Sequence, residues 1–414
     1  MSQIEKKLRT SIMRNAQLKL PYYQQWMFDK PVLVSWEKFV FTSKLQKIFF
    51  KLINEFVVNF ESYTHLMPIS DSAQKVVDIW QKKDGYEIGT YRTDFVLDHQ
   101  GNYRPIEITC RFAMNGYFVT SILNKHVAEQ ISERESHLYY FPYDSFPSYF
   151  ADRLNQNERL FVLRDSEFQN ESKIFEPILS DAGIEVVFVT VSDLNANRYA
   201  FGGCLIINEL TIDEILRLND EAHCRLATAN LMNDFRTVLL VHDKRFFSVI
   251  NDVALQKNCL LPEEIDICKR VFIPSEIYST DSNLWRAAKH NKDGWILKHR
   301  ALGKSQSVYA GAFMTQDEWM ALFDKNDIDD YVLQEWIPQS TFSGQIGGTE
   351  YHDYVTGTLL FCDDKHFGFA EFRTSSFPVT NKVDNRKCVS LVIKDDKNYS
   401  LGDTSDFINI GLFF

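Results

Sequence analysis

The stretch YRTDFVLDHQGNYRPIEIT, residues 91–109, constrains the fold more than any other part of the sequence. Two segments of alternating polarity flank a short glycine-containing turn, which is the pattern of a β-hairpin. If Gln100-Gly101 form the tight turn, Phe95 faces Ile106, and the apolar residues of the two strands share one face. The sequence therefore predicts a hairpin with one buried side.

The other face of this predicted hairpin is charged. In the same register Asp94 faces Glu107, and Arg92 faces Thr109. Two opposed carboxylates repel each other and destabilise a hairpin by roughly 0.2–1 kcal/mol. A divalent cation would relieve the repulsion, since Mg²⁺ is held by one or two carboxylates together with waters and phosphates. The alternative is a solvent-facing hairpin in which Arg92 neutralises the acids.

Composition and charge exclude several classes of function. A chain of 414 residues with 45% hydrophobic content can bury more than one core. The formal net charge of -11 argues against nucleic-acid binding as the main activity. Seven cysteines without a C-x-x-C pair favour reduced thiols over a disulfide framework or a zinc site. Because the sequence shows neither a signal peptide nor an apolar run of about 18 residues, we expect a soluble, cytoplasmic protein without a membrane partner.

The pattern of elements divides the chain into four parts. Residues 1–85 are predicted to be mainly helical, and residues 86–150 hold the hairpin and a following helix. Residues 151–232 alternate buried strands with helices, as in a small parallel α/β unit of Rossmann-like type, but contain no G-x-G-x-x-G motif. Residues 233–414 contain predicted strands separated by polar loops. The predicted fold class is α/β, of the mixed (α+β) kind.

The last part contains two segments suited to a nucleotide. Lys298 closes the strand GWILK and is followed by a basic loop with Gly303 and Lys304, where an ammonium and backbone N–H groups can receive phosphate. The strand YVLQEWI carries Gln334 and Glu335 where a main chain can read an adenine edge. The ordinary alternatives are a solvated turn between strands and a plain strand end.

Two further basic residues are candidates. Lys244 precedes an amphipathic helix and is either a phosphate contact or a surface lysine. Arg373 lies two residues after Glu371 on one face of a strand, where the pair binds substrate or phosphate or forms an exposed ion pair of little value. Nucleophilic catalysis finds no support, because neither G-x-S-x-G nor H-E-x-x-H occurs in the sequence.

Five short segments occur in an order that resembles the circularly permuted ATP-grasp ligases of the glutathionylspermidine-synthase type. They are RTDF, IEIT, HDKRFFSVI, WILKHRALGKS and VLQEWI, and the resemblance covers roughly residues 85–125 and 235–380. It implies a circularly permuted ATP-grasp fold with an α/β pre-ATP-grasp segment and a helical N-terminal region. Two departures are Thr109, where the family has asparagine, and His299, where it has proline. With few glycines in the loop, they leave a weakened or altered nucleotide site open.

The resemblance implies an ATP- and Mg²⁺-dependent ligase that joins a carboxylate to an amine through an acyl phosphate. The substrates would be a small-molecule or peptide carboxylate and an amine. The implied metal ligands are Asp94, Glu107 and Thr109. The implied nucleotide contacts are Lys244, Lys298, Gly303, Gln334, Glu335 and Ile337. The transferring phosphate or the substrate would contact Arg92 and Arg373.

Two other interpretations remain open. An ATP-dependent small-molecule kinase would share the phosphoryl-transfer half of the reaction, so only its products would separate it from a ligase. A non-catalytic binding protein could retain the fold, and an absence of nucleotide binding would favour it. The sequence identifies neither substrate, and it is compatible with a monomer or a homo-oligomer.

Overall fold

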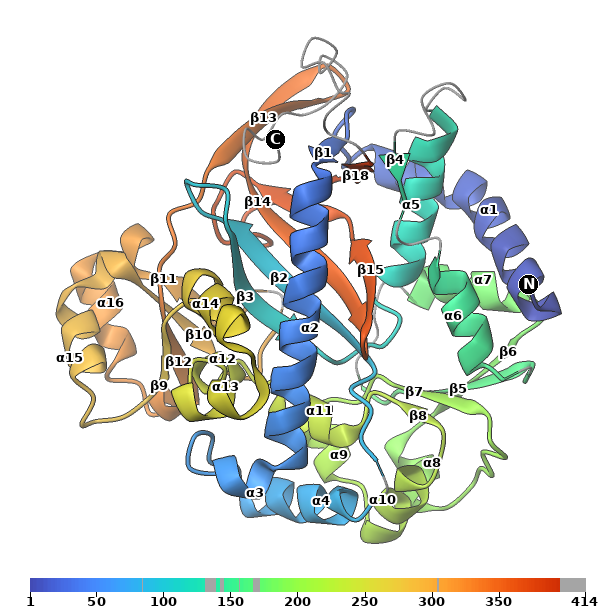
Figure 1. Ribbon diagram of the computed structural model, residues 1–414, viewed down its shortest axis with the longest axis horizontal. Coiled ribbons are helices and arrows are strands. Elements are labelled where there is room, and N and C mark those ends of the chain that lie inside the picture. The colour runs from blue at the N-terminus through green and yellow to red at the C-terminus, as the bar shows by residue number, and fades with distance from the viewer. Residues whose placement is uncertain are drawn as a thin grey trace.

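The computed structural model describes residues 1–83, 85–130, 139–141, 145–155, 157–166, 172–303 and 305–394. Lys304, which belongs to the predicted basic loop, lies outside the described residues. Figure 1 shows a central sheet that is covered by helices and flanked by smaller sheets. The predicted mixed α/β class is confirmed. Within the described residues, no helix combines the length and the apolar character that a membrane span requires.

The central sheet carries the charged hairpin. Its strands lie in the order β17-β16-β14-β2-β3, and β13 and β15 also pair with β14. The bounds are β2 (Thr90–Leu97), β3 (Tyr103–Thr109), β13 (Thr341–Ile346), β14 (Thr349–Cys362), β15 (Lys365–Phe369), β16 (Phe372–Ser375) and β17 (Arg386–Cys388). The antiparallel pairing of β2 with β14 places Asp94 beside Thr358. The predicted hairpin is therefore confirmed, and it lies next to a strand from the last part of the chain.

The turn of the hairpin differs from the prediction by one residue. His99 and Gln100 form its centre, because the N–H of Gly101 donates to the carbonyl of Asp98 at 2.9 Å. Gly101 adopts φ +74°, which glycine tolerates without the steric penalty that a side chain would bring. This arrangement is a three-residue hairpin loop with a left-handed glycine at its end, and not the predicted two-residue turn.

A β-bulge between the turn and the acids shifts the pairing of β2 with β3 by one residue. Phe95 faces Pro105 and not Ile106 as predicted, but Asp94 faces Glu107 because the pairing shifts between these two rungs. Ile106 is the extra residue, and it lines the same cavity as Glu107 instead of sharing the apolar face of Phe95. Bulges re-aim side chains and are frequent beside active sites. The prediction that the acids oppose each other is confirmed, although the register next to the turn was wrong.

Helices from two regions cover the faces of the central sheet. In Figure 1, α2 crosses one face, where Phe49 and Phe56 belong to the same core as Phe95 and Phe361. On the other face, α5 packs against Leu360 and neighbouring residues. The bounds of the helices in the first part of the chain are α1 (Gln3–Gln24), α2 (Trp36–Val58), α3 (Phe60–Tyr63), α4 (Asp71–Gln81), α5 (Tyr117–Gln130) and α6 (Phe146–Arg153).

A small antiparallel sheet lies beside the charged hairpin. Its strands, in the order β11-β10-β12-β9, are β9 (Ser275–Ile277), β10 (Trp295–His299), β11 (Val308–Ala310) and β12 (Tyr331–Glu335). Trp285 of α15 (Asn283–His290) and Trp319 of α16 (Gln316–Leu322) form a separate core on its outer side. The short 3-10 helices around this sheet are η3 (Lys292–Gly294), η4 (Gly311–Phe313) and η5 (Ile328–Asp330). The inner side of the sheet therefore faces β2 and β3 (Figure 1).

A parallel sheet is formed in the segment where the sequence predicted one. Its order is β6-β5-β7-β8, and all its pairings are parallel. The bounds are β5 (Arg159–Leu163), α7 (Ser172–Asp181), β6 (Glu185–Val189), α8 (Val191–Asn195), β7 (Leu205–Asn208), α9 (Ile212–Leu216), α10 (Asp220–Ala227) and β8 (Leu231–Met232).

The remaining elements connect these sheets. A small sheet joins the two halves of the chain, because β1 (Val32–Val34) pairs in parallel with β18 (Ser390–Ile393), which also pairs with β4 (Tyr139–Tyr140). Four helices follow the parallel sheet along the chain and precede the small antiparallel sheet: α11 (Phe235–Leu240), α12 (Phe246–Val249), α13 (Val253–Cys259) and α14 (Pro262–Val271). The segment before Lys244 forms the buried helix α11.

Candidate active site

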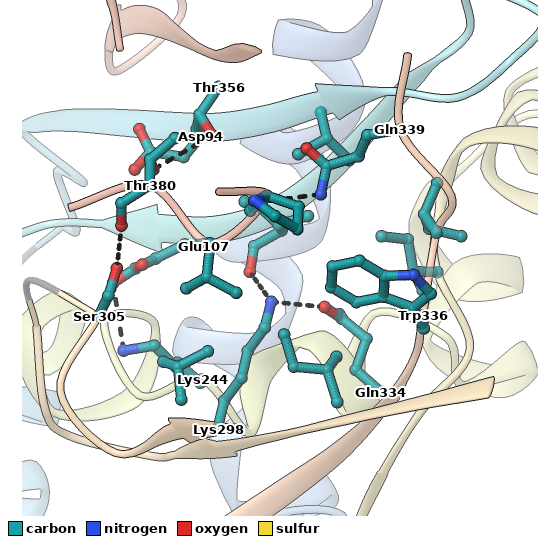
Figure 2. A pocket seen from close by; sticks show the side chains of 18 of the residues that line it. Asp94, Glu107, Lys244, Lys298, Ser305, Gln334, Trp336, Gln339, Thr356 and Thr380 are labelled. Atoms are coloured by element: carbon teal, nitrogen blue, oxygen red, sulfur yellow. Dashed lines mark hydrogen bonds and ion pairs between the residues drawn. The ribbon is translucent and has the colours of Figure 1, made fainter. Parts of the chain in front are cut away.

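A cavity lies between the central sheet and the small antiparallel sheet, and Figure 2 shows its lining. The space between its lining atoms, counted out to its opening toward solvent, is about 750 Å³. Of the residues predicted for the site, it is lined by Asp94, Glu107, Lys244, Lys298, Gln334, Glu335, Ile337 and Arg373. Packing thus brings together eight residues that the sequence scatters over almost 280 positions.

One end of the cavity is apolar. It is formed by Val96, Ile273, Ile296, Val308, Trp336 and Ile337. Val96, Ile273 and Ile337 pack together on the side of the hairpin, and Ile296 and Val308 pack on the side of the small sheet. A flat aromatic ligand group would bury its two faces between these clusters.

At the other end of the cavity the two opposed acids each have a cation of their own. Asp94 is 4% exposed; its Oδ1 accepts a hydrogen bond from Thr358 Oγ1 at 2.7 Å, and its Oδ2 forms an ion pair with Arg373. Glu107 Oε1 lies 3.1 Å from Lys244 Nζ. Arg373 and Lys244 therefore relieve the repulsion across the hairpin, and not Arg92, which the sequence offered as the alternative to a cation.

Lys244 lies where three parts of the molecule meet. Its ammonium contacts Glu107 of the hairpin and donates to the carbonyl of Leu302 at 2.6 Å, in the loop after β10. Its backbone N–H donates to the carbonyl of Arg300 at 3.0 Å. Burial alone would raise the pKa of Glu107, but the charge of Lys244, assisted by Lys298 and Arg373, holds that pKa below its usual value. The carboxylate of Glu107 is therefore ionised at neutral pH.

Lys298 projects from β10 into the centre of the cavity (Figure 2). Its Nζ donates to Gln334 Oε1 at 2.6 Å and to the carbonyl of Ile106 at 3.0 Å. Gln334 is oriented in turn, because its Nε2 donates to Ser275 Oγ at 2.9 Å. Burial lowers the pKa of Lys298 to about 8, against the opposing effect of Glu107. Lys298 thus carries its charge at neutral pH and loses it within an accessible alkaline range.

Three predicted site residues do not line this cavity. Arg92 and Thr109 face each other two rungs away from the acids, and Arg92 Cδ packs close to Gly116. Gly303 follows Leu302, which does line the cavity, and no atom would lie within 4 Å of a Cβ at Gly303. Among the described residues there is no group of three or more His, Cys, Asp or Glu that could hold a metal ion. A metal here would rely on Asp94 and Glu107 together with oxygens from another source.

Several lining residues were not found from the sequence. They are Ser305, Trp336, Gln339, Thr356 and Thr380, all labelled in Figure 2. Trp336 lies in the segment YVLQEWI that the sequence suggested for an adenine contact, so its position beside Gln334 and Glu335 was a usable signal. The others are small or neutral residues on loops and on β14, where no local pattern marks them. Ser305 Oγ donates to the carbonyl of Thr380 and connects the loop after β10 with the segment after β16.

Comparison with known proteins shows a similar fold. A glutathione synthetase-like effector from Globodera pallida, solved in its apo form, matches with a TM-score of 0.56. The match covers 93% of this chain and 96% of that chain at 12% sequence identity, so the likeness concerns the fold. A family model described as the AnkG N-terminal domain matches residues 41–240. No curated protein matches the sequence.

Proposed function

We propose that the cavity binds ATP with Mg²⁺ and that the protein is an ATP-dependent carboxylate–amine ligase. One observation carries the proposal: a single cavity between two sheets combines an apolar slot at one end with two carboxylates and two cations at the other, and a third cation, Lys298, lies between them. A nucleotide has the same polarity, with a flat base and a charged phosphate chain. The similarity in fold to a glutathione synthetase-like protein supports this assignment.

The nucleotide would lie along the cavity with its base at the apolar end. The end of β12, from Gln334 to Ile337, would contact the base edge, and Trp336 would cover the base. Lys298 and Lys244 would contact the phosphates, since both ammonium groups are buried and directed into the cavity. Compact ammonium charges in a site of low dielectric bind phosphate strongly.

The two carboxylates fit a magnesium ion when a nucleotide is present. Mg²⁺ takes one or two carboxylates and completes its shell with waters and phosphate oxygens, so that Asp94 and Glu107 suffice without a third acid. The ion would neutralise charge on the phosphates and orient them. Thr109 remains a predicted ligand from the family resemblance, but it lies outside the cavity lining, and the proposal does not depend on it.

The reaction begins with an attack by a substrate carboxylate on the γ-phosphorus of ATP. The bond from the γ-phosphorus to ADP breaks, and an acyl phosphate forms. An amine then attacks the acyl carbon, loses a proton and displaces phosphate, which leaves an amide. Arg373, at the polar end, would stabilise charge on the transferring group. Arg92 remains a contact to the acyl phosphate that the family resemblance implies, but it lies outside the cavity lining, and the proposal does not depend on it.

Calorimetric titration with a non-hydrolysable ATP analogue, with and without Mg²⁺, tests the nucleotide site. We expect micromolar binding that requires Mg²⁺ and is lost in Asp94→Asn and Glu107→Gln. Lys269→Met is a suitable control, because Lys269 is an exposed surface residue paired with Asp266. The absence of binding to the folded wild-type protein would refute the proposal.

The second step is a screen of acids and amines for ADP release with analysis of the products. An amide product supports a ligase, and a stable phosphorylated product supports a kinase. A nucleotide-binding protein without catalysis is the second candidate. The ion pairs that already occupy Asp94 and Glu107 favour this alternative. Binding of the analogue without ADP release from any acid and amine pair would support it.

A further inference from the structure

The polar end of the cavity forms a closed set of ion pairs without any ligand. Asp94 is paired with Arg373, and Glu107 is paired with Lys244. Lys244 is 5% exposed and Asp94 is 4% exposed, so water cannot replace a lost partner at either residue. Whatever binds here must therefore supply a new partner for Lys244 and Asp94 when it separates them from Glu107 and Arg373, whose side chains are partly exposed.

A divalent cation alone cannot meet this condition. To reach the carboxylates of Asp94 and Glu107 it would displace Arg373 and Lys244, and these two cations would remain in the cavity without counter-ions. A nucleotide without a metal meets the converse difficulty. Its phosphates would attract Arg373 and Lys244 away from the acids, and two carboxylates would remain unpaired beside the phosphate chain. Removing one partner of a buried ion pair is strongly unfavourable.

Charge counting leads to the same result. The charged lining residues that are buried or half-buried sum to a formal charge of +1, from Lys244, Lys298 and Arg373 against Asp94 and Glu107; Glu335 is exposed to water and is left out of this sum. A divalent cation alone would raise it to about +3, and a triphosphate of charge about −4 would lower it to about −3. The complex of the two leaves about −1, the smallest imbalance of the three. In that complex the phosphates take Lys244 and Arg373, and the metal takes the two acids.

We propose that Lys244 and Arg373 make the site selective for a metal–nucleotide complex over either the metal or the nucleotide alone. The inference rests on the proposed function, because it concerns the same cavity. The two residues act as exchangeable counter-ions: they neutralise the acids before binding and neutralise the phosphates afterwards. Selectivity of this kind prevents the free metal from occupying the acids and the free nucleotide from filling the cavity in an unreactive state.

Three titrations of the wild-type protein test the inference. The probes are Mn²⁺ alone, a non-hydrolysable ATP analogue in the presence of EDTA, and the Mn²⁺ complex of that analogue. Binding of Mn²⁺ is followed by its electron paramagnetic resonance signal, and binding of the analogue is followed by calorimetry. We expect the complex to bind at least about thirtyfold more tightly than either component. Binding of either component within about threefold of the complex would overturn the inference.

Variants identify the residues responsible. Arg373→Met leaves Asp94 without its cation, and Lys244→Met does the same for Glu107. In each variant we expect Mn²⁺ alone to bind at least about tenfold more tightly than in the wild type, and the complex to bind more weakly. Lys269→Met, as a surface control, should change none of the three affinities. If both folded variants bind Mn²⁺ no better than the wild type, the two residues do not set the selectivity.

The failure of this inference is distinct from failure of the proposed function. If the Mn²⁺ complex does not bind the wild-type protein, the cavity is not a nucleotide site and both proposals fall. If the complex binds but the components bind equally well, the proposed function stands and only the counter-ion exchange is wrong. Should either variant fail to fold, the three wild-type titrations still decide between these outcomes.

Discussion

The side chain of Asn233 holds the open end of the charged hairpin to the parallel sheet, and we predict that Asn233→Ala loosens this end while β2 stays paired with β14. Asn233 follows β8 and is 1% exposed. Its Oδ1 accepts from the backbone N–H and the hydroxyl of Thr90, both at 3.0 Å. Its Nδ2 donates to the carbonyl of Thr90 at 2.7 Å and to that of Cys110 at 2.6 Å. Since β2 begins at Thr90 and Cys110 follows β3, this amide connects both strands to the parallel sheet.

The expected loss of stability follows from these contacts. Four buried hydrogen bonds contribute about 1 kcal/mol each to the free energy of unfolding. Asn233 also adopts φ +68°, and alanine tolerates this left-handed conformation less well than asparagine, by about 1 kcal/mol. We therefore expect Asn233→Ala to lower the free energy of unfolding by about 5 kcal/mol. Asn233→Gly should recover about 1 kcal/mol of this loss, because glycine accepts positive φ.

Urea unfolding followed by circular dichroism measures the effect. Asn197→Ala is the matched control, because Asn197 has φ +53° but an exposed side chain, and we expect it to cost about 1 kcal/mol. Binding of the Mg²⁺ complex of an ATP analogue should weaken in Asn233→Ala, since the hairpin carries both acids. If Asn233→Ala destabilises the protein no more than Asn197→Ala, the anchoring role of the amide is refuted.

Three further predictions follow from other sites. The affinity for the nucleotide complex should stay constant from pH 6.5 to 7.5 and fall above pH 8, because Lys298, with its pKa of about 8, loses its charge there. If calorimetry finds no fall by pH 9.5, this lysine does not contact the phosphates. Gly357→Ala should lower the free energy of unfolding by roughly 2–3 kcal/mol, because its Cβ would lie 2.1 Å from Phe95 Cζ, and Phe95→Leu should restore at least half of that stability in urea unfolding. A thiol reagent should label one cysteine rapidly in the folded protein, and this fast phase should vanish in Cys224→Ser, since Cys224 is the exposed cysteine.

Local pattern was sufficient for the identity of the key residues. Alternation of polarity on both sides of a glycine-containing turn placed Asp94 opposite Glu107, and strand ends placed Lys298 and Gln334 as candidates. The register of the turn was not predictable at the level of one residue, because the bulge at Ile106 leaves no mark in the amino-acid pattern. The turn was predicted one residue too late, and the bulge adds one residue to β3. These two offsets cancel, so that the acids still face each other.

The sequence by itself determined which chemical groups are present and which of them share a strand face, because spacing of two along a strand depends on covalent geometry alone. Only the tertiary structure decided their partners. Arg373 reaches Asp94 because β14 lies between β2 and β16, and Lys298 reaches the hairpin because the small sheet packs against it. Such contacts depend on how distant surfaces pack. For that reason the sequence could place the two acids opposite each other, but it could not show that Arg373 and Lys244 pair with them.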